Sequence, residues 1–209
     1  RTHAEHTIHV RQVIKVFNEA NLRANFKKCE FGKLELVVLG YLISPTGIKL
    51  APSKLFKMDH WKPPTTGLML QRHLGFLNYC RELIPIYSKL TAPLDKLRSA
   101  TKIIWTLELQ AIYDQIRSIM ESKTILSYPN FKEPFYVATD ASNKGLGAVL
   151  YQIINDKTHY ISFASRSLST GEKGYGATKR ELLAIVYSLE HFKYYILGKQ
   201  FILFTDHRA

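Results

Sequence analysis

The spacing of apolar residues changes along the chain, and the change falls near residue 130. Before it, apolar positions recur at the period of an amphipathic helix. These helical segments are 5–24, 52–62, 68–81 and 105–121. After it, short alternating runs predict strands, and one longer segment predicts a helix. The strands are 134–140, 146–153, 159–165 and 201–206, and the helix is 176–197.

Turn-forming residues separate these segments. Residues 25–31, a turn at Gly32 and residues 34–43 predict two short strands paired as a hairpin, with a further turn at 45–47. Pro52 and Ser53 are suited to begin a helix. Prolines 63 and 64 end that helix, and the threonines that follow can cap the next one.

The second part has a predictable topology. Its first three strands are joined by short turns and should therefore pair antiparallel. The helix then returns the chain to a fourth strand, which a right-handed crossover places parallel to the first. This arrangement puts Asp140 and Asp206 side by side at strand ends, with Glu181 in the first turns of the covering helix. The last strand is expected to form an exposed edge.

Three carboxylates converging in this way suit a two-metal phosphodiester site. Mg²⁺ prefers carboxylate oxygens and keeps several waters. A pair of such ions stabilises both the attacking and the leaving oxygen. The alternative is that the three are unrelated surface acids, since a strand-end Asp is often a turn or cap residue. His207, next to Asp206, is interpreted as a structural or surface residue.

Composition and charge limit the classes of partner that the chain is expected to bind. The chain has 209 residues, 46% of them hydrophobic, so it can build a core. Its net charge of +12 suggests a polyanionic partner, either nucleic acid or an anionic membrane. Residues 1–98 hold 16 basic against 7 acidic side chains, and residues 99–209 hold 13 against 10. The first part is therefore expected to grip a nucleic-acid backbone.

Three class exclusions follow from the sequence. It has no apolar run of 18 residues, which excludes a spanning helix. It shows no signal-peptide pattern, so we expect an intracellular protein that is not secreted. Its two cysteines have no zinc spacing, and we expect them to be buried thiols.

One helical segment carries a stripe that does not suit a core. Gln71, Gly75 and Tyr79 are four residues apart and share one face of the helix at 68–81. A polar side chain, a missing side chain and an aromatic ring suit the minor groove of a duplex. The alternative is that the glycine packs against a neighbouring helix.

Several sequence stretches resemble a known family. TDASNKGLGAVLYQ, ISFASRSLS and KRELLAIVYSLEHFKYYILGKQFILFTDHRA resemble the RNase H domain of gypsy-type LTR retrotransposons and their retroviral relatives. NFKKCEF and VLGYLISPTGI resemble the part of a reverse transcriptase just after its polymerase active-site strand. LQRHLGFLNYC resembles the thumb helix. The resemblance implies reverse transcriptase palm and thumb in 1–98, a connection helix and linker in 99–130, and an RNase H-like domain in 131–209.

The resemblance also implies a fold and roles for particular residues. The fold is α+β or α/β, with a helical thumb-like region followed by an incomplete RNase H-like mixed sheet. The implied catalytic and metal-binding residues are Asp140, Glu181 and Asp206, with two Mg²⁺ or Mn²⁺ ions. The implied nucleic-acid contacts are a primer grip at Leu39, Gly40 and Tyr41 and a minor-groove track at Gln71, Gly75, Asn78 and Tyr79.

The chain departs from the family pattern in two places. The family's fourth carboxylate lies on a later helix that this sequence lacks, and no Tyr-x-Asp-Asp strand occurs. We therefore expect a fragment of a pol polyprotein with weak or no RNase H activity and no polymerase activity. It would work in the cytoplasm, a virus-like particle or the nucleus. Its expected partners are RNA–DNA hybrid or duplex nucleic acid and the rest of the polyprotein, with no membrane.

Two other functions compete with this hypothesis. A non-catalytic nucleic-acid-binding remnant would bind duplexes through residues 1–98 in a salt-dependent manner and hydrolyse nothing. An α/β protein of unrelated metabolism is the third, but no phosphate loop or dinucleotide fingerprint supports it.

Overall fold

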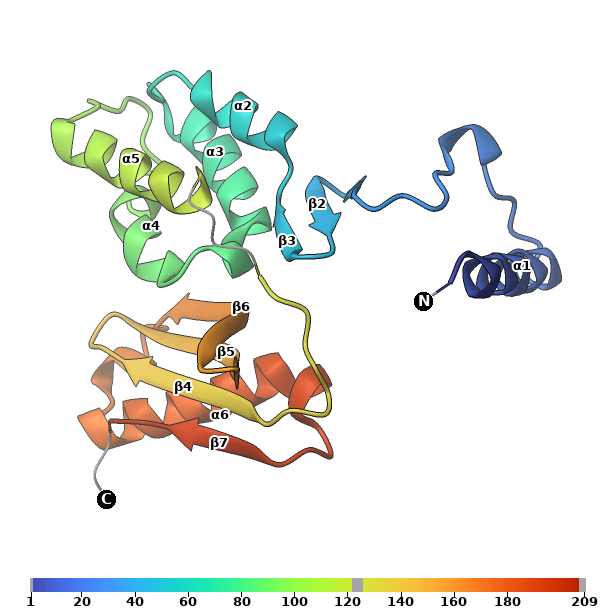
Figure 1. The fold of residues 1–209 in the computed structure, drawn as a ribbon. Coiled ribbons are helices and arrows are strands. Elements are labelled where there is room, and N and C mark those ends of the chain that lie inside the picture. Colours follow the sequence, from blue (N-terminus) through green and yellow to red (C-terminus); the bar gives the residue numbers. More distant parts are fainter. Residues whose placement is uncertain (1, 122–125, 207–209) are drawn as a thin grey trace.

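Two bodies, one mainly helical and one built on a sheet, make up most of the chain (Figure 1). The computed structural model describes residues 2–121 and 126–206. His207 and part of the predicted linker, 122–125, therefore lie outside the described residues. The first helix, α1 (His3–Glu19), lies to one side of both bodies.

The N-terminal segment begins as expected and then departs from the prediction. Thr2 and Glu5 form a reciprocal capping box that begins α1, and none of the helix residues is buried. The strand predicted at 25–31 is wrong, because this stretch contains the 3₁₀ turn η1 (Phe26–Lys28). The side chain of Asn25 accepts a hydrogen bond from the Lys27 amide at 3.1 Å. Such local bonding by Asn competes with strand pairing.

A small sheet follows instead of a two-stranded hairpin. It contains β1 (Leu36–Val38), β2 (Tyr41–Ser44) and β3 (Gly47–Leu50) in sequence order, all antiparallel. The predicted strand at 34–43 is broken at Leu39 and Gly40, which have φ of 50° and 80° and form the first turn. The 45–47 turn closes a second hairpin with β3, a strand that the prediction omitted.

The helical body packs around one apolar core. It contains α2 (Pro52–Asp59), α3 (Gly67–Tyr79), α4 (Tyr87–Asp95) and α5 (Leu107–Glu121), with the 3₁₀ turn η2 (Arg81–Leu83) between α3 and α4. Thr66 caps α3 through a bond from the Met69 amide at 3.3 Å, as the sequence predicts. Its fully buried side chains include Leu70, Leu74, Leu77, Ile84, Leu94 and Ile116.

The second body is a four-stranded sheet covered by one helix. Its elements are β4 (Phe135–Ala141), β5 (Gly145–Ile154), β6 (Lys157–Ser167), the 3₁₀ turn η3 (Glu172–Gly174), α6 (Ala177–Ile196) and β7 (Phe201–Phe204). The strand order is β6-β5-β4-β7, with β4 parallel to β7 and the other pairs antiparallel. This is the predicted fold, and β7 forms one of its two edges.

The core of the second body lies between the sheet and α6. Phe135, Val137 and Leu150 project from the sheet and are almost fully buried against Phe192 of the helix. The strand alternation and the helical period therefore meet at one interface, which fixes the register of β4. In the part of the chain that the structure describes, no helix is long and apolar enough to cross a membrane.

Candidate metal centre

The ends of β4 and β7 carry two carboxylates to the same edge of the sheet. Ala138 pairs with Phe204 in the parallel register, and Asp140 and Asp206 each lie two residues further along. The buried Thr139 hydroxyl donates to the carbonyl oxygen of Phe204 at 3.4 Å, which holds the two strand ends together. Parallel pairing therefore places both aspartates at one site.

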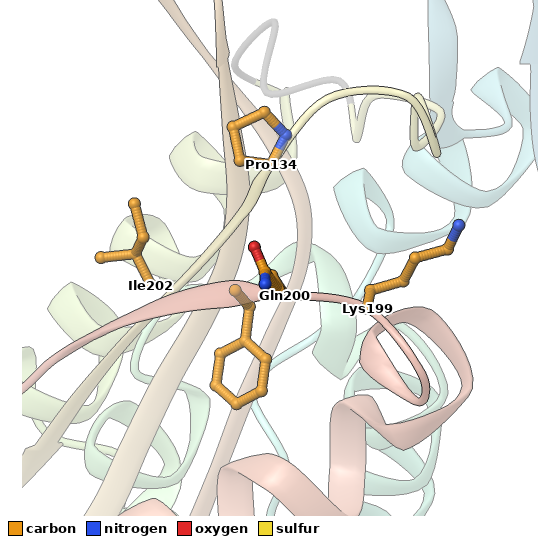
Figure 2. A pocket seen from close by; sticks show the side chains of 5 residues that line it. Pro134, Lys199, Gln200 and Ile202 are labelled. Atoms are coloured by element: carbon orange, nitrogen blue, oxygen red, sulfur yellow. The ribbon is translucent and has the colours of Figure 1, made fainter.

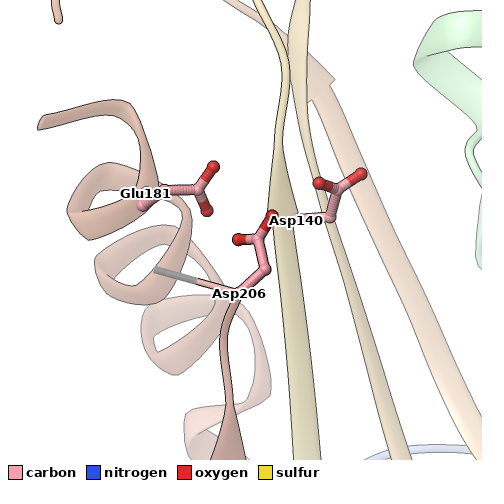
Figure 3. Close-up of side chains that lie close together, drawn as sticks. All are labelled: Asp140, Glu181 and Asp206. Carbon is pink, nitrogen blue, oxygen red and sulfur yellow. The ribbon is translucent and has the colours of Figure 1, made fainter. Parts of the chain in front are cut away.

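Glu181 reaches the same place from α6. One carboxylate oxygen from each of Asp140, Glu181 and Asp206 lies within 4.8 Å of the others (Figure 3). Glu181 is only 9% exposed, whereas both aspartates are exposed. The structure thus brings together the three carboxylates that the sequence singled out, with one wall inside the protein and the other side open to solvent.

A tight turn next to Asp140 keeps the end of β4 in place. The hydroxyl oxygen of Ser142 accepts hydrogen bonds from the amides of Lys144 and Gly145, at 3.2 and 3.1 Å. A Cβ atom on Gly145 would lie 2.8 Å from the carbonyl oxygen of Arg166 on β6. Glycine is therefore required there by the close approach of two backbones.

An ion pair fixes the segment that leads into α6. Arg166 on β6 makes a two-pronged contact with Glu172 at 2.7 and 2.8 Å. Its guanidinium also lies 5.3 Å from the ring centroid of Tyr187 on α6. The hydrogen bonds from Arg166, and further ones from Ser169, lower the pKa of Glu172 to about 2. The segment before α6, the helix that carries Glu181, is therefore held against the sheet.

The donor set fits a hard divalent cation. An ion that contacts two oxygens at about 2.1 Å holds them no more than about 4.2 Å apart. The observed limit of 4.8 Å is close to this value, and small rotations of the exposed aspartates would close the gap. All three donors are carboxylates, the ligands that Mg²⁺ and Mn²⁺ favour.

The second body, which we call the sheet domain, has a surface hollow at the end of the sheet opposite the carboxylates. It is lined by Pro134, Lys199, Gln200, Phe201 and Ile202 (Figure 2). These residues surround the beginnings of β4 and β7, whereas the carboxylates follow the ends of the same strands. We therefore place the candidate chemistry at the carboxylates.

Leu39, Tyr41 and Tyr79, three of the residues expected to contact nucleic acid, meet at the junction of the small sheet and α3. Tyr41 donates its hydroxyl proton to the carbonyl oxygen of Tyr79 at 2.7 Å, and the two rings stack. Tyr79 in turn donates to the carbonyl oxygen of Leu39. Burial raises the pKa of Tyr41, so its hydroxyl stays a donor. The turn at Leu39 and Gly40 is thereby fastened to the end of α3.

The rest of the stripe on α3 faces solvent. Gln71, Gly75, Asn78 and Tyr79 are all exposed. Among the described residues, a Cβ atom added at Gly75 would meet nothing within 4 Å. In the described part of the chain, the glycine therefore does not serve packing against a neighbouring helix. Gln71 donates its amide to the carbonyl oxygen of Arg98 at 2.8 Å, which leaves its carbonyl oxygen for another partner.

Sequence reasoning missed two basic residues near these groups. The ammonium group of Lys54 lies 5.3 Å from the ring centroid of Tyr79 and 5.4 Å from that of Phe76. Arg81, just after α3, donates to the carbonyl oxygen of Ser165 in the other body. The sequence predicts only that Lys54 lies on the helical segment 52–62. The contacts of Lys54 with the two rings and of Arg81 with Ser165 depend on the tertiary structure.

Comparison with known proteins places this geometry in a family. Residues 105–203 match the family described as an RNase H-like domain found in reverse transcriptase. This stretch includes α5 of the helical body and nearly all of the second body. The match begins at the start of the helical segment 105–121, before the predicted boundary near residue 130. The domain divisions inferred from the sequence stay predictions.

Proteins similar in sequence to this chain include transposon polyproteins. It is 37% identical over 206 residues to the Retrovirus-related Pol polyprotein from transposon 297 of Drosophila melanogaster, covering 98% of the chain and 19% of that polyprotein. It is 32% identical over 212 residues to the Transposon Tf2-3 polyprotein of Schizosaccharomyces pombe, covering 100% of the chain and 16% of that polyprotein. The chain thus spans less than a quarter of these relatives.

A solved structure shares the fold along the whole chain. The foamy viral protease-reverse transcriptase, solved in complex with RNA/DNA hybrid, superimposes with a TM-score of 0.83 at 24% identity. The likeness covers 100% of this chain and 29% of the viral one. Both bodies described above, with their arrangement, therefore belong to a known fold.

Proposed function

We propose that this chain hydrolyses the RNA strand of RNA–DNA hybrids with Mg²⁺ or Mn²⁺, using Asp140, Glu181 and Asp206. The observation that carries the proposal is the convergence of three carboxylate oxygens within 4.8 Å inside a domain of the RNase H-like family. Because Mg²⁺ completes its shell with waters and substrate phosphate oxygens, three carboxylates are enough to hold it.

The two exposed carboxylates and the buried one would serve the site differently. Bound divalent cations supply an activated water and neutralise the charge that develops on the leaving 3′-oxygen. The carboxylates of Asp140 and Asp206 are exposed and would therefore be the ones nearest an approaching phosphodiester. The buried Glu181 anchors the inner side of the site, where α6 covers the sheet. The chain thus supplies three fixed oxygens and leaves the outer positions to water and substrate.

The helical body and the small sheet are proposed to hold the hybrid. They carry most of the excess positive charge, since residues 1–98 contain 16 basic and 7 acidic side chains. The exposed face of α3 and the turn at Leu39 and Gly40 would contact the primer and template backbones. A structural neighbour was solved with RNA/DNA hybrid, which supports this class of ligand. A relative is named a Pol polyprotein, which supports a chain that acts as part of a larger polyprotein; we propose that it does so inside the cell.

Cleavage of a labelled hybrid in Mn²⁺ tests the proposal. The chain should cut the RNA strand of the hybrid, and Asp140→Asn should abolish cutting while leaving hybrid affinity unchanged or higher. Asp156→Asn is the matched control, because Asp156 is an exposed aspartate in the β5–β6 turn. Salt-sensitive binding of the hybrid by a folded chain that never cleaves would contradict the hydrolytic proposal and favour a binding remnant.

A further inference from the structure

One arginine joins the two bodies next to the candidate duplex-binding face. Arg81 begins η2, the turn that follows α3. One terminal nitrogen of its guanidinium donates to the carbonyl oxygen of Ser165 on β6. The other donates to the side-chain oxygen of Asn78 on α3 at 3.4 Å. The carbon of the guanidinium lies 5.6 Å from the ring centroid of Tyr87, so the side chain is held on three sides.

Ser165 is the receiving point in the sheet domain. It is 3% exposed, and its hydroxyl oxygen accepts a hydrogen bond from the Ser88 amide at 3.0 Å. Ser88 is the second residue of α4, so two elements of the helical body bond to the same residue of β6. A Cβ atom on Gly145 would lie 3.4 Å from the Ser88 hydroxyl oxygen. The two bodies therefore meet closely at this seam.

The register of the sheet connects this seam to the carboxylates. Ser165 pairs with Gly147 on β5, and Gly147 pairs with Asp140 on β4. Neighbouring strands lie about 4.8 Å apart, so Asp140 is about 10 Å from the residue that Arg81 contacts. Asn78, at the other side of Arg81, belongs to the exposed face of α3. Arg81 therefore contacts both the exposed face of α3 and a residue that lies two strands away from Asp140.

We propose that Arg81 is a positioning residue that fixes the spacing between the face of α3 and the carboxylate site along a bound hybrid. This inference rests on the proposed function, since it concerns where that site cuts. Arg81 itself touches no reacting atom. A planar guanidinium donates in two directions at once from a fixed fork, whereas the ammonium of a lysine is a compact charge on a flexible stem. Losing the fork would let the sheet domain move relative to α3.

Cut-site mapping and tumbling together test the proposal. On a blunt hybrid with end-labelled RNA, the unaltered chain should cut within a narrow range from one end. Arg81→Ala should spread the cuts over more positions, with an overall rate that changes less than about threefold, since the carboxylates stay intact. Arg81→Lys should give an intermediate spread. Lys89→Ala, which removes an exposed charge from α4 near Ser88, should cut as the unaltered chain does.

Nuclear relaxation of backbone ¹⁵N gives a readout that needs no cleavage. The unaltered chain and Lys89→Ala should show one overall correlation time for the helical body and the sheet domain. Arg81→Ala should keep dispersed spectra, which show that both bodies are folded, but give two distinct correlation times. If the chain never cleaves, the proposed function is wrong, but the relaxation measurement still tests whether Arg81 holds the two bodies together.

Two results would overturn the positioning role. One is Arg81→Ala tumbling as a single body, whether or not its cuts change. The other is a uniform loss of hybrid affinity with unchanged cut positions, which would make Arg81 a phosphate contact instead.

Discussion

The hydroxyl of Tyr41 donates a hydrogen bond to the carbonyl oxygen of Tyr79, and the two rings stack with centroids 5.3 Å apart. Tyr41 belongs to β2 and Tyr79 is the last residue of α3, 38 positions later. This contact fixes the turn at Leu39 and Gly40 against the exposed face of α3. The two elements expected to hold nucleic acid are therefore bonded directly to each other.

Removing that hydroxyl should loosen the surface. Tyr41→Phe keeps the stacked ring but leaves the Tyr79 carbonyl without this donor. We expect a loss of about 1 kcal/mol in the free energy of unfolding, the usual worth of one such bond, and weaker hybrid binding. Urea unfolding and hybrid titration measure the two effects. Tyr194→Phe is the control, because that ring is 85% exposed; equal behaviour of both variants would contradict the argument.

A substitution at Gly75 should change hybrid affinity and folding stability in opposite directions. Because a Cβ atom there meets no described neighbour, Gly75→Ala should fold normally and gain up to about 1 kcal/mol from its higher helix propensity. Hybrid affinity should nevertheless fall, because the added methyl group blocks close approach of the duplex. Gly174→Ala, also in open space but in the sheet domain, should leave affinity unchanged. If Gly75→Ala binds as well as the unaltered chain, α3 does not track a groove.

We predict that Lys54, whose ammonium group lies over the rings of Phe76 and Tyr79, contacts a phosphate of bound nucleic acid. Lys54→Met keeps most of the aliphatic stem that packs beside Gly40 but removes the charge. The slope of log affinity against log salt should become shallower by roughly 0.9, the value for one phosphate contact on a duplex. Lys57→Met, on the exposed side of the same helix, serves for comparison. An unchanged slope for Lys54→Met would rule the phosphate contact out.

Low pH should weaken the ion pair between Arg166 and Glu172, which lies just before α6. The pKa of Glu172 is lowered to about 2 by its bonds to Arg166 and Ser169. Its contribution to stability is therefore present above the ordinary carboxyl pKa and is lost as pH falls from there towards 2. Glu172→Gln should lower the melting temperature at neutral pH and flatten its acid dependence over this range. A variant that keeps the original acid profile would show that other carboxylates dominate.

The sequence alone predicts the sheet topology and the carboxylate cluster. It does not predict the contacts that join distant elements to one another. Alternating strands joined by short turns, and one crossover helix, leave few ways to arrange β4 to β7. Strand ends then bring Asp140 and Asp206 together. The segment 25–31 misled because apolar residues near Asn25 resemble a strand, while the Asn side chain stabilises a turn. The contacts of Arg81 with Ser165 and of Tyr79 with Leu39 span 84 and 40 positions, which no local pattern encodes.

A Mn²⁺ titration followed by electron paramagnetic resonance tests the central claim most directly, because it reports the metal site without requiring turnover. The account predicts saturable Mn²⁺ binding by the unaltered chain that is competed by Mg²⁺. Binding should weaken strongly in both Asp140→Asn and Asp206→Asn and stay intact in Asp156→Asn. Mn²⁺ binding that is equal in all four proteins, or absent from the unaltered folded chain, would contradict a divalent metal site formed by Asp140, Glu181 and Asp206.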